Sequence, residues 1–261
     1  MVLFYVGDID IASQPLLGMV GSRRHSLLAN GRIDQLMTQV RQYGIVSGGA
    51  LGIDGLAHQA ALQCMRSTVA VLASGLDSFY PKTNRGLFDQ ILASNIGVIV
   101  SEFPPSIRPQ PYYFPQRNRL IASLSSKLVV IEAMQKSGAM ITANIAAQIG
   151  VDVGAVIGGY NSPHYSGCYD LIFDGACAIG NDQQWQLFLY EGVDLTVNRH
   201  VTDLTKIEQL ILDNVPFEPI HIDDLASACD MHVNELIEKI TVLTLNGHID
   251  MTSGQLICRY A

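Results

Sequence analysis

The sequence predicts an α/β protein in which a mostly parallel sheet carries helices on both faces and a small domain follows. Three observations predict this fold. Over the first 180 residues, short β-branched runs alternate with stretches of helical periodicity. The strand runs are continuously apolar, which is typical of parallel strands buried on both faces. From about residue 181 to 205 the alternation fades, and a different pattern begins at 206.

The predicted strands end in small residues, and most are followed by a helix. The first strand, 17–20, runs into Gly21, and the second, 45–46, runs into Ser47. Further strands are predicted at 68–73, 97–100, 127–131 and 153–157, and helices at 33–43, 54–63, 87–94 and 141–149. Because the carboxyl ends of parallel strands meet at one edge of a sheet, we expect these turns to line one crevice.

The last part of the chain has its own pattern. We expect the first domain to span 1–190, a linker to span 191–205 and a second domain to span 206–261. Helices are predicted at 206–214, 223–228 and 233–245, followed by a hairpin of 247–251 and 255–260. Three helices followed by a hairpin is the element order of a winged helix.

Composition excludes several classes of protein. Of 261 residues, 48% are hydrophobic and 15% are charged, which excludes a disordered chain and provides ample core. No apolar run approaches the roughly 18 residues that span a bilayer, so we expect no membrane partner and a cytoplasmic location. The five cysteines are odd in number and form no CxxC, so we expect reduced thiols and neither a metal site nor a cofactor.

The net charge of −8 is unevenly distributed along the chain. Residues 1–150 hold 12 Lys and Arg against 8 Asp and Glu, a charge of +4, whereas 151–261 hold 4 against 16, a charge of −12. Only the first half is therefore expected to present a phosphate-binding face.

Several turns have the chemistry of anion sites. Gly21-Ser22-Arg23 combines close backbone approach, a hydroxyl and a guanidinium, although an ordinary strand-to-helix turn would look the same. Lys136-Ser137-Gly138 stands at a predicted helix start, where backbone N–H groups are free to meet an anion.

The stretch 104–119 is the richest in binding chemistry. It places three arginines, three adjacent aromatic residues and an asparagine on what we interpret as a proline-stiffened loop. Cations and ring faces together are what holds single-stranded nucleic acid. The structural alternative is that Phe114 fills the core while Arg117 or Arg119 pairs with Glu102 or Glu132.

No convergent catalytic set is visible in the sequence. The turn 47–54 matches neither a dinucleotide fingerprint nor a Walker loop. Asp54 stands where a helix N-cap would be, and His58 is better explained by packing than by base catalysis. The carboxylates Glu102 and Glu132 form a pair on paper only, since no spacing forces them together. We therefore expect a protein that is not an enzyme.

Taken in order, the motifs resemble the DprA/Smf family. The matching series is Gly-Ser-Arg at 21–23, SGGALGID at 47–54, GLDSFYP at 75–81, SEFPP at 101–105, FPQRNRLIASLS at 114–125 and EAMQKSGAMITA at 132–143. The resemblance continues through GCYDLIFDGA at 167–176 to VLTLNGHI at 242–249. Leu51 stands where the family often has an arginine, which removes one possible phosphate contact.

The resemblance implies an extended Rossmann-like fold with a C-terminal winged helix. It implies a homodimer that binds single-stranded DNA, protects incoming strands in natural transformation and helps to load the RecA recombinase. Carried over by position, the nucleic-acid-binding residues are Gly21, Ser22, Arg23, Ser47, Gly48, Phe114, Arg117, Asn118, Arg119, Lys136, Ser137, Gly138 and Thr142. The helical N-terminal domain of many members is not expected in the 16 residues that precede the first strand predicted here.

Two other interpretations stay open. One is a nucleotide-processing enzyme of the lysine-decarboxylase-like Rossmann group, of the phosphoribohydrolase type, although the PGGxGTxxE loop of those enzymes is absent. The other makes the acidic C-terminal domain a protein-docking module. Its candidate recognition helix carries Glu235 and Glu238 against Lys239, so we expect it not to bind duplex DNA.

Overall fold

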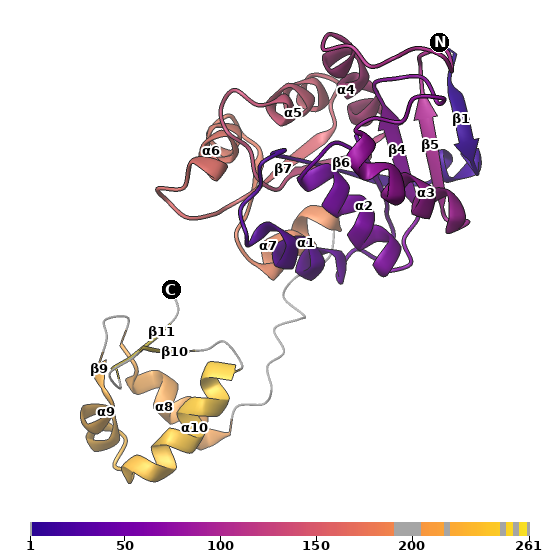
Figure 1. Cartoon of the computed structure of the whole chain (residues 1–261). Coiled ribbons are helices and arrows are strands. Elements are labelled where there is room, and N and C mark those ends of the chain that lie inside the picture. Colours follow the sequence, from indigo (N-terminus) through magenta and orange to yellow (C-terminus); the bar gives the residue numbers. More distant parts are fainter. Residues whose placement is uncertain (1, 191–204, 217–219, 246–248, 253–255, 260–261) are drawn as a thin grey trace. The chain divides into compact units, whose positions relative to one another are not determined.

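An eight-stranded sheet forms the centre of the N-terminal unit (Figure 1). Its spatial order is β1-β5-β4-β3-β2-β6-β7-β8, and every neighbouring pair is parallel except β1 with β5. The strands are β1 (Phe4–Gly7), β2 (Leu16–Val20), β3 (Gly44–Ser47), β4 (Thr68–Leu72), β5 (Gly97–Ser101), β6 (Lys127–Val130), β7 (Asp152–Val156) and β8 (Cys177–Ile179). The predicted mostly parallel α/β fold is thereby confirmed.

Helices cover both faces of this sheet. In Figure 1, α1 (Ala29–Met37), α2 (Ile53–Gln63), α3 (Arg85–Ala93) and α7 (Asp182–Leu189) lie on one side, and α4 (Tyr113–Leu124), α5 (Gly138–Gln148) and α6 (Ser166–Phe173) lie on the other. Short 3₁₀ helices occur at η1 (Ile9–Ser13), η2 (Lys82–Asn84) and η3 (Pro163–Tyr165). The computed structural model describes residues 2–190, 205–216, 220–245, 249–252 and 256–259.

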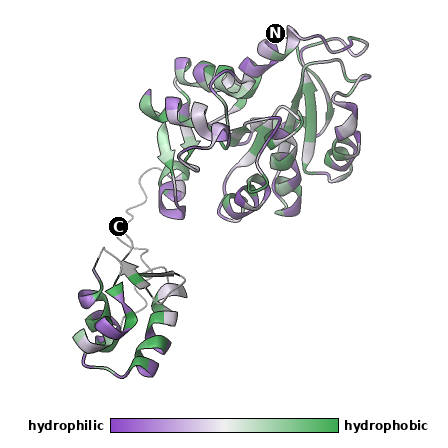
Figure 2. Cartoon of the chain, turned by 60° about the vertical axis from the view of Figure 1, so that its left-hand side comes forward, coloured by the Kyte–Doolittle hydropathy of each residue, from purple (hydrophilic) through white to green (hydrophobic). Residues whose placement is uncertain are grey.

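The core follows the apolar strand runs. All residues of β2, β4 and β5 are buried, and Figure 2 shows the strands as hydrophobic ribbons between helices with hydrophilic outer faces. At roughly 25 cal/mol per Å² of apolar surface removed from water, this sheet supplies the main driving force for folding. The sheet in turn holds the loops at its carboxyl edge in place.

Besides α6 and β8, which were not predicted, three parts of the unit differ from the sequence prediction. The edge strand β1 was not predicted, and it pairs antiparallel with β5 from Phe4↔Ser101 to Gly7↔Val98. The region beyond 181 was interpreted as fading structure, yet α7 forms there because Asn181 caps it, accepting from the Gln184 N–H at 2.9 Å. Trp185 then anchors α7 in the core, donating from Nε1 to the Leu36 carbonyl at 3.0 Å.

The third difference concerns the proline-rich stretch. Residues 113–124 form the helix α4 and not a loop, so the interpretation of 104–119 as one continuous loop was wrong. Pro115 lies in the first turn of α4, where its missing N–H costs no intrahelical hydrogen bond. Arg117, Asn118 and Arg119 are therefore helical residues with fixed directions.

The chain divides into two compact units, 1–193 and 194–261. The second contains α8 (Lys206–Asn214), β9 (Ile220–His221), α9 (Ile222–Ala228), α10 (Val233–Leu245), β10 (Ile249–Thr252) and β11 (Leu256–Arg259). Its antiparallel sheet has the order β10-β11-β9, so the predicted three helices and hairpin are present and one short strand is added. Of the predicted linker 191–205, only Thr205 is described, as the N-cap of α8.

Candidate nucleic-acid interface

A cavity of about 430 Å³ opens at the carboxyl ends of β2 and β6. β2 has β3 on one side and β6 on the other, so the chain reverses its direction of travel through the sheet between these strands. Such a switch point is where open α/β sheets bind their ligands. The cavity lining holds four cationic side chains against one carboxylate: Arg23, Arg24, Arg117 and Lys136, with Asp54.

Most of the residues predicted to bind nucleic acid meet in this cavity. Ten of them line it: Gly21, Ser22, Arg23, Phe114, Arg117, Asn118, Lys136, Ser137, Gly138 and Thr142. They come from the turn after β2, from α4 and from the start of α5, which are far apart in sequence. The other three, Ser47, Gly48 and Arg119, do not line it.

The turn after β2 is packed too tightly for a side chain at Gly21. A Cβ there would lie 2.6 Å from Ile53 Cγ1 and 2.8 Å from the Glu132 carbonyl oxygen. The next residue closes the turn: the Ser22 N–H donates to the Glu132 carbonyl at 2.6 Å, and the Ser22 hydroxyl donates to the Arg24 carbonyl at 2.8 Å. The Ser22 hydroxyl is thus used by the turn itself, and Arg23 is exposed.

Arg23 and Phe114 form a cation–aromatic pair at the cavity. The Arg23 guanidinium carbon lies 4.9 Å from the centre of the Phe114 ring, and the Tyr80 ring meets the same phenyl ring edge-on at 5.9 Å. Phe114 is only half-buried, so the alternative interpretation, in which this ring fills the core, was wrong. The pair offers a positive charge and a ring face at one place.

Arg117 is a buried cation at the cavity, whereas Arg119 is exposed. Only 3% of Arg117 is exposed, and its Nη1 donates to the Val71 carbonyl while its Nε has no hydrogen-bond partner among the described residues. Burial lowers the pKa of Arg117 to about 10, although Asp54 raises it. The guanidinium therefore keeps its charge at neutral pH, beside the cavity.

Asp54 and His58 both lie close enough to Arg117 for its charge to affect their pKa values. Burial raises the pKa of Asp54, and the charge of Arg117 lowers it by a smaller amount, so the pKa stays above its ordinary value. Burial and then Arg117 lower the pKa of His58 to about 3, and the ring is fully buried with Nδ1 2.7 Å from Thr68 Oγ1. His58 is thus a packed neutral side chain, as the sequence indicated. Asp54 is not the N-cap of α2, because Gly52 occupies that position with a φ of 78° and Asp54 lies in the first turn.

The N-terminus of α5 faces the same cavity. Ser137 is its N-cap but makes no side-chain capping bond, and the Ser137 hydroxyl oxygen is buried without a partner among the described residues. Asn118 Nδ2 donates to the Gly138 carbonyl at 3.2 Å, which ties α4 to this turn. N–H groups at a helix start, a hydroxyl without a partner among the described residues and the exposed Lys136 have the chemistry of an anion site.

The periodicity of α4 explains which of its residues reach the cavity. Phe114, Arg117, Asn118 and Ile121 all line it, with the i, i+3, i+4, i+7 spacing of one helix face. Arg119 falls on another face and binds Glu102 with both carboxylate oxygens at 2.6 Å. Because the stretch was interpreted as a loop, this spacing was missed. Had it been treated as a helix, the set of predicted binding residues would have excluded Arg119 and included Ile121.

Ser47 and Gly48 lie next to the cavity without lining it. The Ser47 hydroxyl is fully buried and donates to the Met19 carbonyl at 2.6 Å, which joins β3 to β2. Gly48 lines a smaller adjoining cavity together with Arg23, Tyr80, Phe114 and Arg117. Ser47 therefore has a structural role, whereas Gly48 lies beside the candidate binding site.

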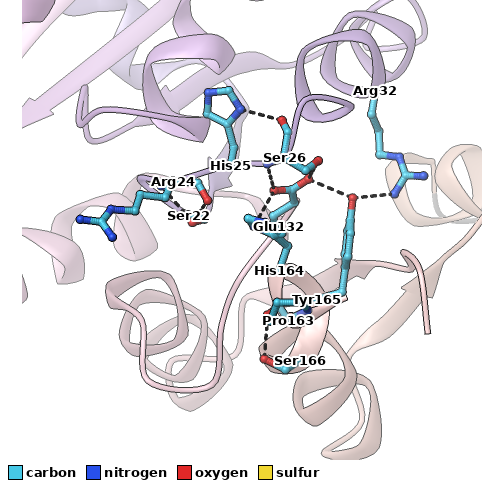
Figure 3. A network of polar contacts seen from close by, with 10 residues as sticks. All are labelled: Ser22, Arg24, His25, Ser26, Arg32, Glu132, Pro163, His164, Tyr165 and Ser166. Atoms are coloured by element: carbon cyan, nitrogen blue, oxygen red, sulfur yellow. Dashed lines mark hydrogen bonds and ion pairs between the residues drawn. The ribbon is translucent and has the colours of Figure 1, made fainter. Parts of the chain in front are cut away.

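A polar network around Glu132 holds the turn after β2 in position (Figure 3). Glu132 has no exposed surface, and its carboxylate accepts from the Ser26 N–H at 2.8 Å, the Ser26 hydroxyl at 2.5 Å and the Tyr165 hydroxyl at 3.0 Å. His164 Nδ1 lies 3.7 Å from the second carboxylate oxygen. Both oxygens therefore accept hydrogen bonds within the protein, and Glu132 is not among the residues that line the cavity.

Sheet order also separates the carboxylates that formed a pair on paper. Glu102 follows β5 and Glu132 follows β6, and three strands lie between β5 and β6 in the sheet. Within the described part of the chain, no group of three or more His, Cys, Asp or Glu is placed to hold a metal ion, and no helix is long and apolar enough to cross a membrane. The arrangement at the cavity is suited to binding anions.

Two family models match this chain, and together they cover most of it. The family model described as DNA recombination-mediator protein A matches residues 1–189, and the DprA winged helix domain matches residues 199–255. DprA of Streptococcus pneumoniae is 39% identical over 70% of this chain and 64% of that protein, and its X-ray structure superposes with a TM-score of 0.66. Protein Smf of Escherichia coli is 33% identical over 97% of this chain and 70% of that protein.

A structure of DprA from Helicobacter pylori, which describes the single-stranded DNA binding mode of that protein, is 30% identical with a TM-score of 0.64. It covers 72% of this chain and 84% of the H. pylori chain. Against the full S. pneumoniae protein, the present chain spans under two thirds of the length. The match across the whole sheet and the winged helix is decisive, and the chain belongs to the DprA/Smf family.

Proposed function

We propose that this protein binds single-stranded DNA without sequence preference, through the cavity at the ends of β2 and β6. The observation that carries this is the pairing of Arg23 with Phe114 above a cavity that holds four cations and one carboxylate. Cations neutralise phosphates, and exposed ring faces stack unpaired bases whatever their identity.

The described residues divide this task between them. A phosphate is bound by Lys136, by the N–H groups at the start of α5 and by the Ser137 hydroxyl. The buried Arg117 adds positive charge next to this phosphate site. Phe114 stacks a base, because one part of its ring remains accessible. No contact in this set reads a base edge, so affinity is independent of sequence and falls steeply with salt.

We propose further that the protein protects incoming strands and helps to load the RecA recombinase during natural transformation, acting as a homodimer in the cytoplasm. Membership of the family supports this role, as do the relatives named as DNA processing proteins and the H. pylori relative with its single-stranded DNA binding mode. An enzymatic role on nucleotides is not proposed, because the carboxylate that would act, Glu132, is buried and does not line the cavity.

Fluorescence anisotropy with labelled oligo(dT) and a matched duplex, titrated with salt, tests the binding proposal. The wild type should bind the single strand more tightly than the duplex, and Arg23→Ala should weaken single-strand binding by about tenfold or more. Arg41→Ala is the matched control, because it also removes one positive charge. Arg41 is exposed and precedes β3, at the amino ends of the strands and therefore away from the cavity. Equal affinity for both DNA forms, or equal effects of the two variants, would overturn the proposal.

A further inference from the structure

A second, larger hollow lies beside the first and takes no part in the site described so far. Its volume is about 790 Å³. It is formed by the segment that follows β4 and by the segment that follows β5, at the same carboxyl edge of the sheet as the first cavity. Its principal lining residues are Asp77, Phe79, Tyr80, Lys82, Arg85 and Arg108.

Tyr80 connects this second hollow to the first site. Tyr80 lines the hollow and also lines the small adjoining cavity that contains Arg23, Phe114 and Arg117. The rings of Tyr80 and Phe114 lie 5.9 Å apart and meet edge to face. The two sites are therefore neighbours along one surface, with a pair of aromatic rings between them.

The second hollow repeats the chemistry of the first. The Arg85 guanidinium carbon lies 4.7 Å from the centre of the Phe79 ring, as Arg23 lies 4.9 Å from Phe114. Arg85 is partly neutralised by Asp89, at 3.0 Å. Lys82 and Arg108 are exposed, and neither has an ion-pair partner among the described residues.

Unpartnered cations in a concave site attract anions more strongly than cations scattered on a convex surface. Asp77 is the only carboxylate in the lining of the second hollow, against three cationic side chains. Positive charge beside accessible rings, next to a site of the same kind, fits the repeating phosphates and bases of one continuous strand.

We propose that a bound single strand continues from the first cavity over Phe114 and Tyr80 into the second hollow, where Lys82 and Arg108 hold a further phosphate and Phe79 or Tyr80 contacts a further base. This inference rests on the proposed single-stranded DNA binding. It adds a second subsite, and it predicts that affinity rises with strand length until both subsites are filled.

The test compares oligo(dT) of about 4 nucleotides with oligo(dT) of about 16 nucleotides in the anisotropy assay, using the full chain. Arg108→Glu should weaken binding of the long strand by about tenfold and of the short strand by less than about twofold, and it should reduce the salt slope for the long strand by about one or more. Lys82→Glu should behave in the same way. Arg41→Glu changes the net charge by the same amount and should affect neither length specifically.

The outcomes separate the inference from the function on which it rests. If Arg108→Glu and Arg41→Glu act alike, or if Arg108→Glu weakens both lengths equally, the second subsite is wrong while binding at the first cavity stands. If the wild type binds neither length, the proposed function fails and the second subsite fails with it. Retained short-strand binding in Arg108→Glu also shows that the variant is folded.

Discussion

The guanidinium of Arg117 lies directly against Gly48. A Cβ built on Gly48 would lie 2.5 Å from Arg117 Cζ and closer still to Nη1. Arg117 comes from α4 and Gly48 from the turn after β3, so two segments separated by almost 70 residues meet at one point. The missing side chain of Gly48 is what leaves room for the buried cation beside the cavity.

Replacing Gly48 by alanine should displace Arg117. We expect Gly48→Ala to lower the free energy of unfolding by about 1–3 kcal/mol, because the added methyl group overpacks a closed site. It should also weaken single-strand binding in the anisotropy assay. Gly31→Ala is the control: nothing lies within 4 Å of a Cβ there, and alanine in the helix α1 should be neutral or stabilising by up to about 1 kcal/mol. Equal urea midpoints for the two variants would contradict the packing argument.

Arg119 and Arg23 carry the same charge but should contribute differently to DNA binding. Arg119 is bound to Glu102 at 2.6 Å and lies outside the cavity lining, whereas Arg23 lines the cavity above Phe114. Arg119→Ala should therefore change single-strand affinity by less than about threefold, against about tenfold or more for Arg23→Ala. Equal losses in the two variants would show that Arg119 leaves Glu102 to contact the strand.

The Glu132 network should be sensitive to a change of one atom. In Glu132→Gln, one carboxylate oxygen becomes an NH₂ group that faces donors from Ser26 or Tyr165. Leaving buried donors unsatisfied costs about 1–3 kcal/mol, which urea unfolding measures. Tyr165→Phe removes one donor to Glu132 and the acceptor of a hydrogen bond from Arg32, and it should cost about 1 kcal/mol. A Glu132→Gln protein as stable as the wild type would refute the importance of this network.

The same substitution should reach the DNA site. Ser26 follows the turn that carries Arg23, and its two hydrogen bonds go to different oxygens of Glu132, so Glu132→Gln removes one of them and loosens that turn. We expect Glu132→Gln to weaken single-strand binding more than Tyr165→Phe does, measured at a temperature where both variants are fully folded. Identical affinities in the two variants would confine the role of Glu132 to stability.

His58 should make stability depend on pH. Its pKa is about 3 in the folded protein, against 6.5 for an unperturbed histidine. Between these values the unfolded chain binds more protons than the folded chain, so the free energy of unfolding falls as the pH falls, by about 1.4 kcal/mol per pH unit. His58→Gln cannot titrate and should lose this slope, while the opposing effect of Asp54 remains in both proteins. Parallel pH profiles in urea unfolding would contradict the buried neutral histidine.

The winged-helix unit should contribute little to holding DNA. Residues 201–261 hold 3 Lys and Arg against 10 Asp and Glu, and in α10 Glu235 and Glu238 are exposed. Removing residues 206–261 should leave single-strand affinity within about twofold, because the acidic unit neutralises no phosphates. A large loss of affinity, or duplex binding by the full chain that disappears with this unit, would contradict the prediction.

The sequence by itself determined the elements that local patterns encode. Continuous apolar runs such as 68–73 predict buried parallel strands, and β4 follows at Thr68–Leu72. Small residues after each strand predict that the carboxyl edge of the sheet forms a binding crevice. The turns that contain Gly21 and Gly138 do line the cavity at that edge. These features are accessible from the sequence because periodicity and turn chemistry are properties of neighbouring residues.

Only the tertiary structure decided which side chains act together. It placed Phe114, Arg117 and Asn118 on one face of a helix where the prolines had indicated a loop, and it turned Arg119 away to Glu102. It also separated Glu102 from Glu132 by three strands. The physical reason is that strand order, burial and charge pairing depend on contacts between segments distant along the chain, and these are settled by packing of the whole sheet.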